Sequence, residues 1–230
     1  MIFEQLFDQK SSTYTYIIAS GEGREALIID PVIEHSDEYS TILKNLDLKL
    51  VKVIDTHIHA DHISGLSELS KRTNCSKIMG EKSNSEVLDI RVKDNEKIKI
   101  ENIELISMHT PGHTDCSYSF YMNDRIFTGD TLLINGTGRT DFQNGSSFDA
   151  YDSLFNKLLK LPEKTLVYPA HDYNGKKFST IETERNNNPR LQVSSKEEYA
   201  EIMENLKLAN PKMMDVAVPA NVKGLTLEQL

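Results

Sequence analysis

The chain has 230 residues, of which 38% are hydrophobic and 27% are charged, and its formal net charge at pH 7 is −9. This composition is ordinary for a soluble globular protein with enough chain to bury a core, and no apolar run is long enough to span a bilayer. The acidic balance argues against a partner with a phosphate backbone, so we expect no nucleic-acid and no membrane partner. Two cysteines are too few for a disulfide framework, and Met1 to Lys10 lacks the apolar core of a signal peptide, so we expect a cytoplasmic protein.

Apolar periodicity predicts two strands, a helix and a third strand in the first part of the chain. Tyr14–Ala19 and Glu25–Asp30 are predicted strands of a hairpin that ends at Pro31. Ser36–Leu46 has the apolar spacing of a helix, with Ser36 as the expected N-cap. The short β-branched run Leu50–Asp55 then predicts a buried strand.

The stretch that follows this strand, Thr56 to His62, reads THIHADH and concentrates residues that can bind a metal ion. Helix-spaced apolar residues come next, over Ile63–Leu69, so the cluster lies on a strand-to-helix turn, where α/β folds often place their chemistry. One histidine is usually structural, but several potential ligands crowded together are costly to bury without a partner. The cluster therefore predicts a metal or catalytic site. Its ligand-type residues are His57, His59, Asp61 and His62.

The rest of the chain continues with strands, turns and helices, and no linker, repeat or low-complexity run divides it. We therefore predict one domain over residues 1–230, with a short helical and extended C-terminal extension over about 174–230. The order of elements fits an α+β fold, a four-layer αββα sandwich in which each sheet has helices on its outer face. The predicted strands are Ser76–Gly80, Lys97–Ile100, Ile103–Met108, Ser117–Met122, Arg125–Thr128 and Thr165–Pro169; the predicted helices are Phe148–Leu161, about Ser179–Asn187 and Ser195–Leu206, before an extended tail with Pro211 and Pro219.

Further ligand-type residues follow three of these later strands. They are His113 in PGHTD, Asp130 in TGD and His171 in PAHDY. Because four strand ends of a sandwich can meet at one point, we expect these residues to join the first cluster. The two remaining histidines lack such neighbours: we interpret His35 as exposed and His109 as a strand-end residue that either supports the site or does not.

Taken together, HIHADH, PGHTD, TGD and PAHDY resemble the metallo-β-lactamase superfamily. Longer segments narrow the resemblance to the persulfide dioxygenase family, also called the ethylmalonic encephalopathy protein family. The similarity covers the chain from about Phe3 to Gly224. The segments are LLINGTGRTDFQ over residues 132–143, YPAHDY over 168–173, ETER with NPRL over 182–191 and DVAVPAN over 215–221.

This resemblance implies an enzyme, a mononuclear non-haem iron dioxygenase that oxidises glutathione persulfide with O₂ and water to sulfite and glutathione. It implies one Fe²⁺ per chain, held by the first histidine of HxHxDH, the PGH histidine and the TGD aspartate, which here are His57, His113 and Asp130. Such a facial triad leaves positions open for substrate sulfur and O₂. The other ligand-type residues would orient the triad or form a second metal site; they are His59, Asp61, His62 and His171.

Candidate substrate residues follow from the carboxylates of glutathione persulfide, which an arginine fork binds well. Arg139, in the Gly-rich loop after TGD, is the first candidate, with pairing to Asp141 as the structural alternative. Tyr173 either presents its hydroxyl near the iron or substrate, or only packs. The resemblance also implies Asn221 and Lys223, which lie in a tail segment that the family uses near the glutathione site.

The sequence departs from the family pattern near the substrate residues. Cys116 stands where relatives usually carry glycine, the hairpin before TGD is short, and Lys223 with Gly224 stands where relatives often have Arg-Cys-Gly. A lysine is a point charge and does not reproduce an arginine fork. These departures leave the implied iron ligands unchanged and concern the binding of the thiol substrate. Relatives commonly dimerise, which leaves a homodimer open here.

Three other functions fit parts of the pattern. A thioester hydrolase of the glyoxalase II type would use all seven ligands to hold two metals and a bridging hydroxide, although the tail after His171 is short for its substrate domain and the GRTDF and PAN segments favour the dioxygenase. A non-enzymatic binding module would need a closed four-ligand structural site with no room for water. A nuclease is disfavoured by the acidic charge.

Overall fold

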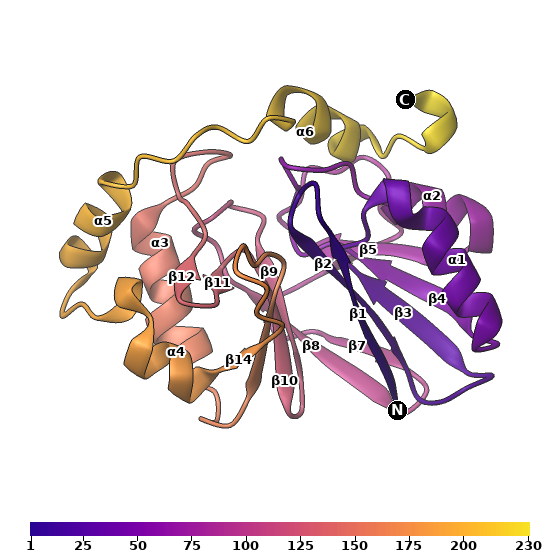
Figure 1. Ribbon diagram of the computed structural model, residues 1–230, viewed down its shortest axis with the longest axis horizontal. Coiled ribbons are helices and arrows are strands. Elements are labelled where there is room, and N and C mark those ends of the chain that lie inside the picture. Colours follow the sequence, from indigo (N-terminus) through magenta and orange to yellow (C-terminus); the bar gives the residue numbers. More distant parts are fainter.

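The computed structural model describes residues 1–230 and contains two six-stranded sheets that face each other (Figure 1). The strand order is β1-β2-β3-β4-β5-β6 in the first sheet and β14-β13-β10-β9-β8-β7 in the second. The strand bounds are β1 Ile2–Asp8, β2 Thr13–Ala19, β3 Glu25–Ile29, β4 Lys49–Ile54, β5 Ser76–Gly80, β6 Ile90–Val92, β7 Lys97–Ile100, β8 Ile103–His109, β9 Tyr118–Met122, β10 Arg125–Gly129, β13 Leu166–Pro169 and β14 Ser179–Thr180, with a small separate hairpin of β11 Leu132–Leu133 and β12 Gly136–Thr137.

Helices cover the outer faces of both sheets, as predicted (Figure 1). On the first sheet, Tyr39 and Leu43 of α1 pack with Leu69 of α2 against apolar residues of β2, β3 and β4. On the second sheet, the helices of the 147–160 segment and α4 and α5 pack against β10 and β13. The helix bounds are α1 Ser36–Asn45, α2 Leu66–Thr73, α3 Ser147–Tyr151, α4 Ile181–Asn187, α5 Lys196–Glu204 and α6 Met214–Lys223. None of these helices combines the length and the apolar character that a membrane-spanning helix needs.

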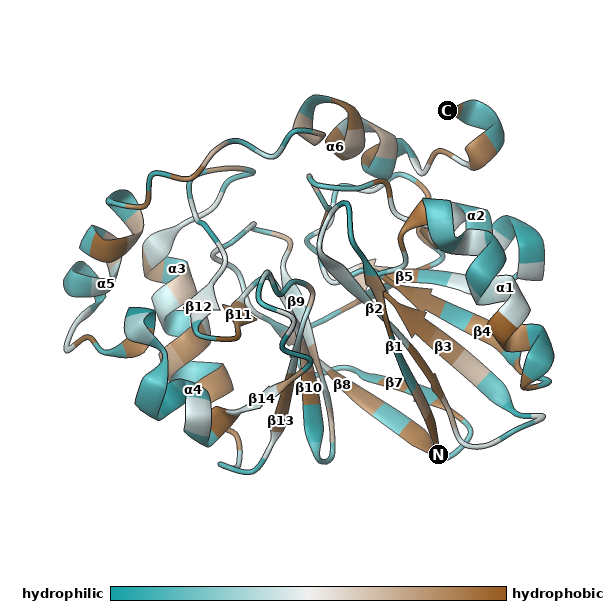
Figure 2. Ribbon diagram, in the orientation of Figure 1, coloured by the Kyte–Doolittle hydropathy of each residue, from teal (hydrophilic) through white to brown (hydrophobic).

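The main core lies between the two sheets. It joins Ile18 and Ile54 of the first sheet with Phe120 and Phe127 of the second, and all four side chains are fully buried. Every residue of β2 is buried, because one face of this strand meets the second sheet and the other meets the outer helices. Figure 2 accordingly shows hydrophobic residues concentrated along the central strands. The αββα sandwich predicted from the order of elements is confirmed.

Several local predictions need correction. β1 and β6 were not predicted, because β1 mixes charged and apolar residues and β6 has only three residues. Ser36 does not cap α1: it is the first helical residue, and its hydroxyl donates to the carbonyl of Ile33 at 2.7 Å. The predicted helix over Phe148–Leu161 exists, but its middle, Asp152–Lys157, is a π-helical turn. His35 is half-buried rather than exposed, between the carboxylates of Asp8 and Glu38.

The C-terminal tail was predicted to be extended, and this prediction was wrong for residues 214–223. They form α6, which includes Pro219. Although proline removes one helical hydrogen bond, α6 buries Ala217 and Ala220 against Ile33 and Ile63. Gly224 then ends the helix in the left-handed conformation that a C-terminal glycine favours. The segment between α5 and α6 passes over the loop edge of the sandwich, so α6 lies above the first half of the chain (Figure 1).

Candidate metal centre

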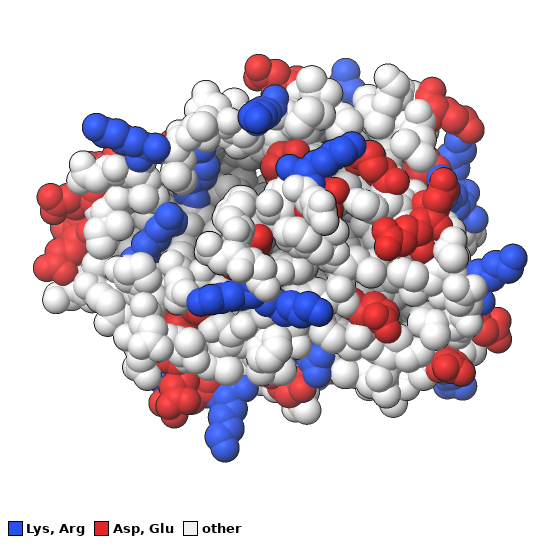
Figure 3. All heavy atoms as spheres, in the orientation of Figure 1, with Lys and Arg blue, Asp and Glu red and all other residues white.

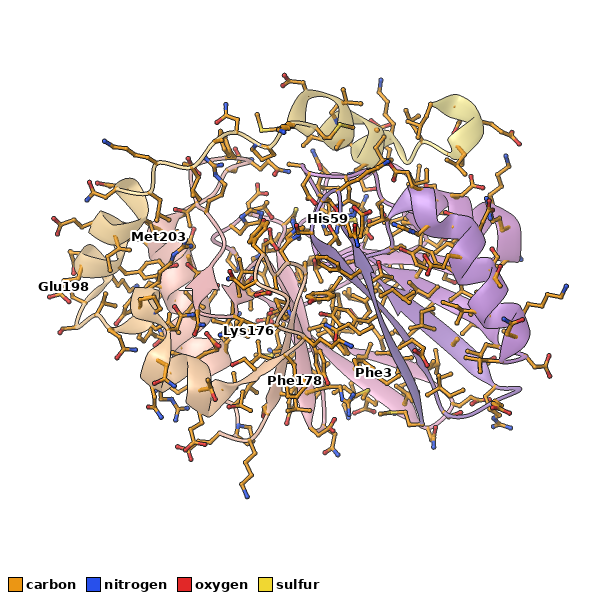
Figure 4. The ribbon with its side chains drawn as sticks, viewed as in Figure 1. Phe3, His59, Lys176, Phe178, Glu198 and Met203 are labelled. Carbon is orange, nitrogen blue, oxygen red and sulfur yellow. The ribbon has the colours of Figure 1, made fainter.

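The seven predicted ligand-type residues meet at one edge of the sandwich. The turn after β4 supplies the first cluster, and the loops after β8, β10 and β13 supply His113, Asp130 and His171. His59, labelled in Figure 4, lies among these loops between the two halves of the molecule. His109, at the end of β8, remains outside the cluster, and its Nε2 instead pairs with the Asp115 carbonyl at 3.0 Å. The convergence of four strand ends expected from the sequence is therefore present.

His57, His113 and Asp130 form one three-residue group at this edge, with their ligand atoms all within 4.8 Å of one another. His113 Nε2 lies 3.4 Å from Asp130 Oδ2, and its Nδ1–H donates to the Arg139 carbonyl at 2.7 Å. His57 Nδ1 lies 3.0 Å from the hydroxyl of Thr56. Because both Nδ1 atoms are engaged, both Nε2 atoms are left to bind a cation.

A second group lies beside this triad. His59, Asp61 and His62 also place their ligand atoms within 4.8 Å of one another, and His171 Nε2 lies 3.5 Å from Asp61 Oδ2 and 3.6 Å from Asp130 Oδ1. His59 Nδ1, His62 Nε2 and Asp130 Oδ1 are buried and have no hydrogen-bond partner. Buried polar atoms without partners are costly, so these orphaned donor atoms fit a site built around metal.

The electrostatics of the cluster also suit a cation. Burial, together with neighbouring imidazoles, holds the pKa values of His57 and His59 well below the usual histidine range, so both rings are neutral ligands. Burial alone would raise the pKa of Asp61, but His62 and His171 outweigh it and hold that pKa well below its usual range. Burial would lower the pKa of His171, yet Asp130 and Asp61 raise it to about 9. The carboxylates thus attract positive charge to the centre of the cluster.

Two buried aspartates behind the cluster were not predicted as functional residues. Asp30, at the end of β3, accepts hydrogen bonds from the Thr56 backbone N–H at 2.7 Å and the Thr56 hydroxyl at 3.0 Å, and its Oδ1 lies 3.1 Å from His59 Nε2. It therefore fixes the His59 ring so that Nδ1 faces the metal side. Burial raises the pKa of the neighbouring Asp55 to about 8. Their place at strand ends just before Pro31 and Thr56 was the signal that could have identified them.

A cleft of about 410 Å³ opens onto the cluster. Figure 3 shows a hollow on this face of the molecule, with charged side chains of both signs around it. An open cleft beside the ligands differs from the closed site that a purely structural metal would need. Its walls include Asp61, His113, Asp130 and His171 on the metal side, Leu133, Thr137, Gly138, Arg139, Tyr173 and Arg190 around them, and Leu208, Ala209 and Pro211 of the α5–α6 connection.

The two arginines of the cleft differ in their partners. Arg139 donates from Nε and Nη2 to the two carboxylate oxygens of Asp141, both at 2.7 Å, and from Nη1 to the Ala209 carbonyl at 2.7 Å. The pairing with Asp141 that the sequence left open is therefore present. Arg190, which the sequence did not single out, is half-buried and has no carboxylate partner; its one side-chain hydrogen bond is to the Thr137 carbonyl.

The other predicted substrate residues lie in different surroundings. Tyr173 is in the cleft wall, exposed, with its ring stacked 6.1 Å from that of His171. Asn221 belongs to α6, is buried, and bonds to the backbone of the metal turn rather than lining the cleft. Lys223 is exposed at the end of α6 and is not part of the cleft wall.

Comparison with known proteins agrees with this geometry. The metallo-beta-lactamase superfamily profile matches residues 9–171. The persulfide dioxygenase ETHE1, mitochondrial, of Mus musculus is 42% identical over 226 residues, which are 97% of this chain and 88% of that protein; the Homo sapiens protein gives the same values. The chain belongs to the persulfide dioxygenase family of the metallo-β-lactamase superfamily.

A solved structure of a persulfide dioxygenase relative agrees closely with this chain in fold. The crystal structure of ETHE1 from Myxococcus xanthus has a TM-score of 0.94 and 46% sequence identity, and the match covers 96% of this chain and 98% of that one. Hydroxyacylglutathione hydrolases are more distant: the one from Pelagibacter ubique is 33% identical over 203 residues, which are 82% of this chain and 79% of that protein. The family that the GRTDF and PAN segments indicated is confirmed.

Proposed function

We propose that the protein is a persulfide dioxygenase that holds one Fe²⁺ and oxidises glutathione persulfide with O₂ and water to sulfite and glutathione. The observation that supports this most directly is the group of His57, His113 and Asp130 at the wall of an open cleft, in a chain 42% identical to persulfide dioxygenases. Two histidines and one carboxylate are the ligand set of non-haem iron oxygenases, and they leave positions open for other ligands.

In this proposal His57, His113 and Asp130 hold the metal, which when bound would supply the redox chemistry that O₂ needs. The protein contributes orientation: the Arg139 carbonyl fixes the His113 ring, and Thr56 with Asp30 fixes the His57 ring. The turnover GSSH + O₂ + H₂O → GSH + SO₃²⁻ + 2H⁺ releases two protons. His171 lies in the cleft wall beside the triad, and its imidazole, whose pKa Asp130 and Asp61 raise to about 9, can hold a proton near the reacting sulfur.

We propose that Arg190 binds a carboxylate of the substrate. Its guanidinium has five N–H donors, of which the protein uses one, and no acidic side chain neutralises it. The residue that it contacts, Thr137, precedes Gly138, which packs directly against His113 and Asp130. A substrate with sulfur at the metal and a carboxylate at Arg190 would therefore lie along the cleft. Tyr173 remains a proposed contact at the cleft wall, and Arg139 shapes the wall through Asp141 and Ala209.

Replacing Arg190 by glutamine is expected to raise KM for glutathione persulfide by about 10-fold or more, since hydrogen bonds to charged groups contribute roughly 1.5–3 kcal/mol, with kcat and iron content little changed. Steady-state O₂ uptake measures both constants. Arg185→Gln is the matched control, because Arg185 pairs with Glu163 outside the cleft. An unchanged KM in the Arg190 variant would remove this residue from the substrate site.

We also propose a cytoplasmic location. The small-molecule partners are glutathione persulfide and O₂, and the protein is either a monomer or a homodimer. The names of the mammalian relatives place those proteins in mitochondria. Neither the departure at Cys116 nor that at Lys223 touches the cleft wall, so we propose that both leave the reaction unchanged.

A second candidate function is a thioester hydrolase with two metal ions. The orphaned nitrogens of His59 and His62 favour it, since they are free to bind a second cation near Asp61. The deciding experiment is O₂ consumption on adding glutathione persulfide to anaerobically purified protein, with the metal content measured on the same sample. Oxygen uptake, sulfite formation and about one iron per chain are expected. No uptake, with two zinc ions per chain, would support the hydrolase instead.

A further inference from the structure

The side chain of Asn221 joins the C-terminal helix to the turn that carries the first ligand cluster. Its Oδ1 accepts from the backbone N–H of Ser64 at 2.8 Å, and its Nδ2 donates to the carbonyls of His59 at 2.9 Å and His62 at 3.0 Å. Both N–H donors of the amide and its acceptor are thus used, in a side chain that is 8% exposed. The three contacts link residues 157 to 162 positions apart in the chain.

No other protein group satisfies these carbonyls. The His59 and His62 carbonyl oxygens accept hydrogen bonds only from Asn221. Other contacts hold neighbouring parts of the turn: Gln143 Nε2 donates to the Ile58 carbonyl at 2.8 Å, and at the C-terminal end the Ile63 carbonyl accepts from the Ile33 N–H at 2.9 Å. Without Asn221 the carbonyls of His59 and His62 would lose their hydrogen bonds, and the Ile58 carbonyl would keep its own.

Helix α6 presents this amide from a fixed position. Ala217 and Ala220 are buried against Ile63, and the Glu86 N–H donates to the Val222 carbonyl at 2.8 Å. Gly224 follows in the left-handed conformation, where an added Cβ would come within 2.5 Å of the Ser67 hydroxyl. Because the middle and the C-terminal end of α6 are packed on the first half of the chain, the helix cannot easily shift to replace a lost amide contact.

We propose that Asn221 is a positioning residue for the metal centre, rather than the substrate contact expected from the sequence. It fixes the backbone of the turn and thereby the directions of the His57, His59 and His62 rings. Its effect on the metal is indirect, through the three backbone groups that it binds. The inference depends on the proposed function only for the identity of the metal.

The test compares Asn221→Ala and Asn221→Asp with Val222→Ala. Val222 packs on the same helix against the first sheet but makes no side-chain hydrogen bond to the turn, so its variant controls for lost packing. Fe²⁺ and Zn²⁺ affinities are measured anaerobically by competition with a chromophoric chelator, and exchange of the Ser64 amide is followed in metal-free protein by NMR. We expect about 10-fold weaker metal binding and faster Ser64 exchange in Asn221→Ala, in the range seen when a group that orients a ligand is removed.

Asn221→Asp should bind metal still more weakly, because a carboxylate replaces two donors and faces two carbonyl oxygens. Val222→Ala should match the wild type in both measurements. Wild-type metal affinity and Ser64 protection in Asn221→Ala would overturn the assignment; if that variant does not fold, Asn221→Asp, which keeps the side-chain volume, decides by the same measurements. A wild type that is loaded with Fe²⁺ and consumes no O₂ with glutathione persulfide would refute the proposed oxidation alone, since the Zn²⁺ comparison still tests Asn221.

Discussion

Replacing His113 by alanine is expected to abolish metal binding and persulfide oxidation while the protein remains folded. His113 supplies one of the three ligands of the proposed triad, and its ring is already aimed at Asp130 by the hydrogen bond from Nδ1–H to the Arg139 carbonyl. Removing a ligand should weaken iron binding by more than the roughly 10- to 100-fold lost when only an orienting group is removed. The side chain lies in the cleft wall and not in the main core, so stability should change little.

Three measurements on the same preparation test this prediction: iron content for metal binding, O₂ uptake for turnover and the circular dichroism spectrum for folding. His109→Ala is a matched control, because His109 is a histidine of the same strand-end segment that bonds to the Asp115 carbonyl outside the cluster. The control should keep its iron and its turnover. If His113→Ala bound iron and turned over as well as the wild type, the assignment of the triad would be wrong.

The ligand cluster could be predicted from the sequence because each group of ligands lies within a few residues of the strand that positions it. Each group of ligands follows a short apolar strand directly, as His57 follows β4 and Asp130 follows β10, and strands of one sandwich end at a common edge. The same locality explains why the outer helices and most strands were predicted correctly. Strand β1 and helix α6 lack such a local pattern. The charged residues of β1 concealed the strand, and Pro219 led to the prediction of an extended tail in place of α6.

The surroundings of the cluster could not be predicted, because they depend on partners far away in the chain. Arg139 has the residue type and position expected of a substrate arginine, yet Asp141 and the Ala209 carbonyl, 70 residues further on, occupy its donors. Arg190 in NPRL gave no comparable signal, and only the fold shows that it reaches the cleft without an acidic partner. Likewise, Asn221 has no sequence feature that separates a substrate contact from a contact with the metal turn.

Gly138 provides the second large expected effect, since its lack of a side chain lets the β12 segment pack against two proposed ligands. A Cβ at this position would lie 2.1 Å from the Asp130 carbonyl oxygen and 3.0 Å from Cβ and Cγ of His113. A backbone oxygen 2.1 Å from the new Cβ is a severe steric clash, and backbone atoms move only at a large energetic cost. Gly138→Ala must therefore displace Asp130, His113 or the residue 139 carbonyl that orients His113. We expect iron binding to weaken by about 100-fold, with roughly 1–3 kcal/mol of stability lost to overpacking.

Gly136→Ala is the matched control for this experiment, since the nearest atoms to its added Cβ are 3.9 and 4.0 Å away, which is ordinary contact. Chelator competition for iron and thermal unfolding of the metal-free protein, applied to both variants, separate a displaced metal site from a general loss of stability. The expected result is a large loss of iron affinity in Gly138→Ala and wild-type affinity in Gly136→Ala. Equal iron affinity in the two variants would show that the close packing of residue 138 does not set the positions of His113 and Asp130. Their own loops alone would then hold these metal ligands.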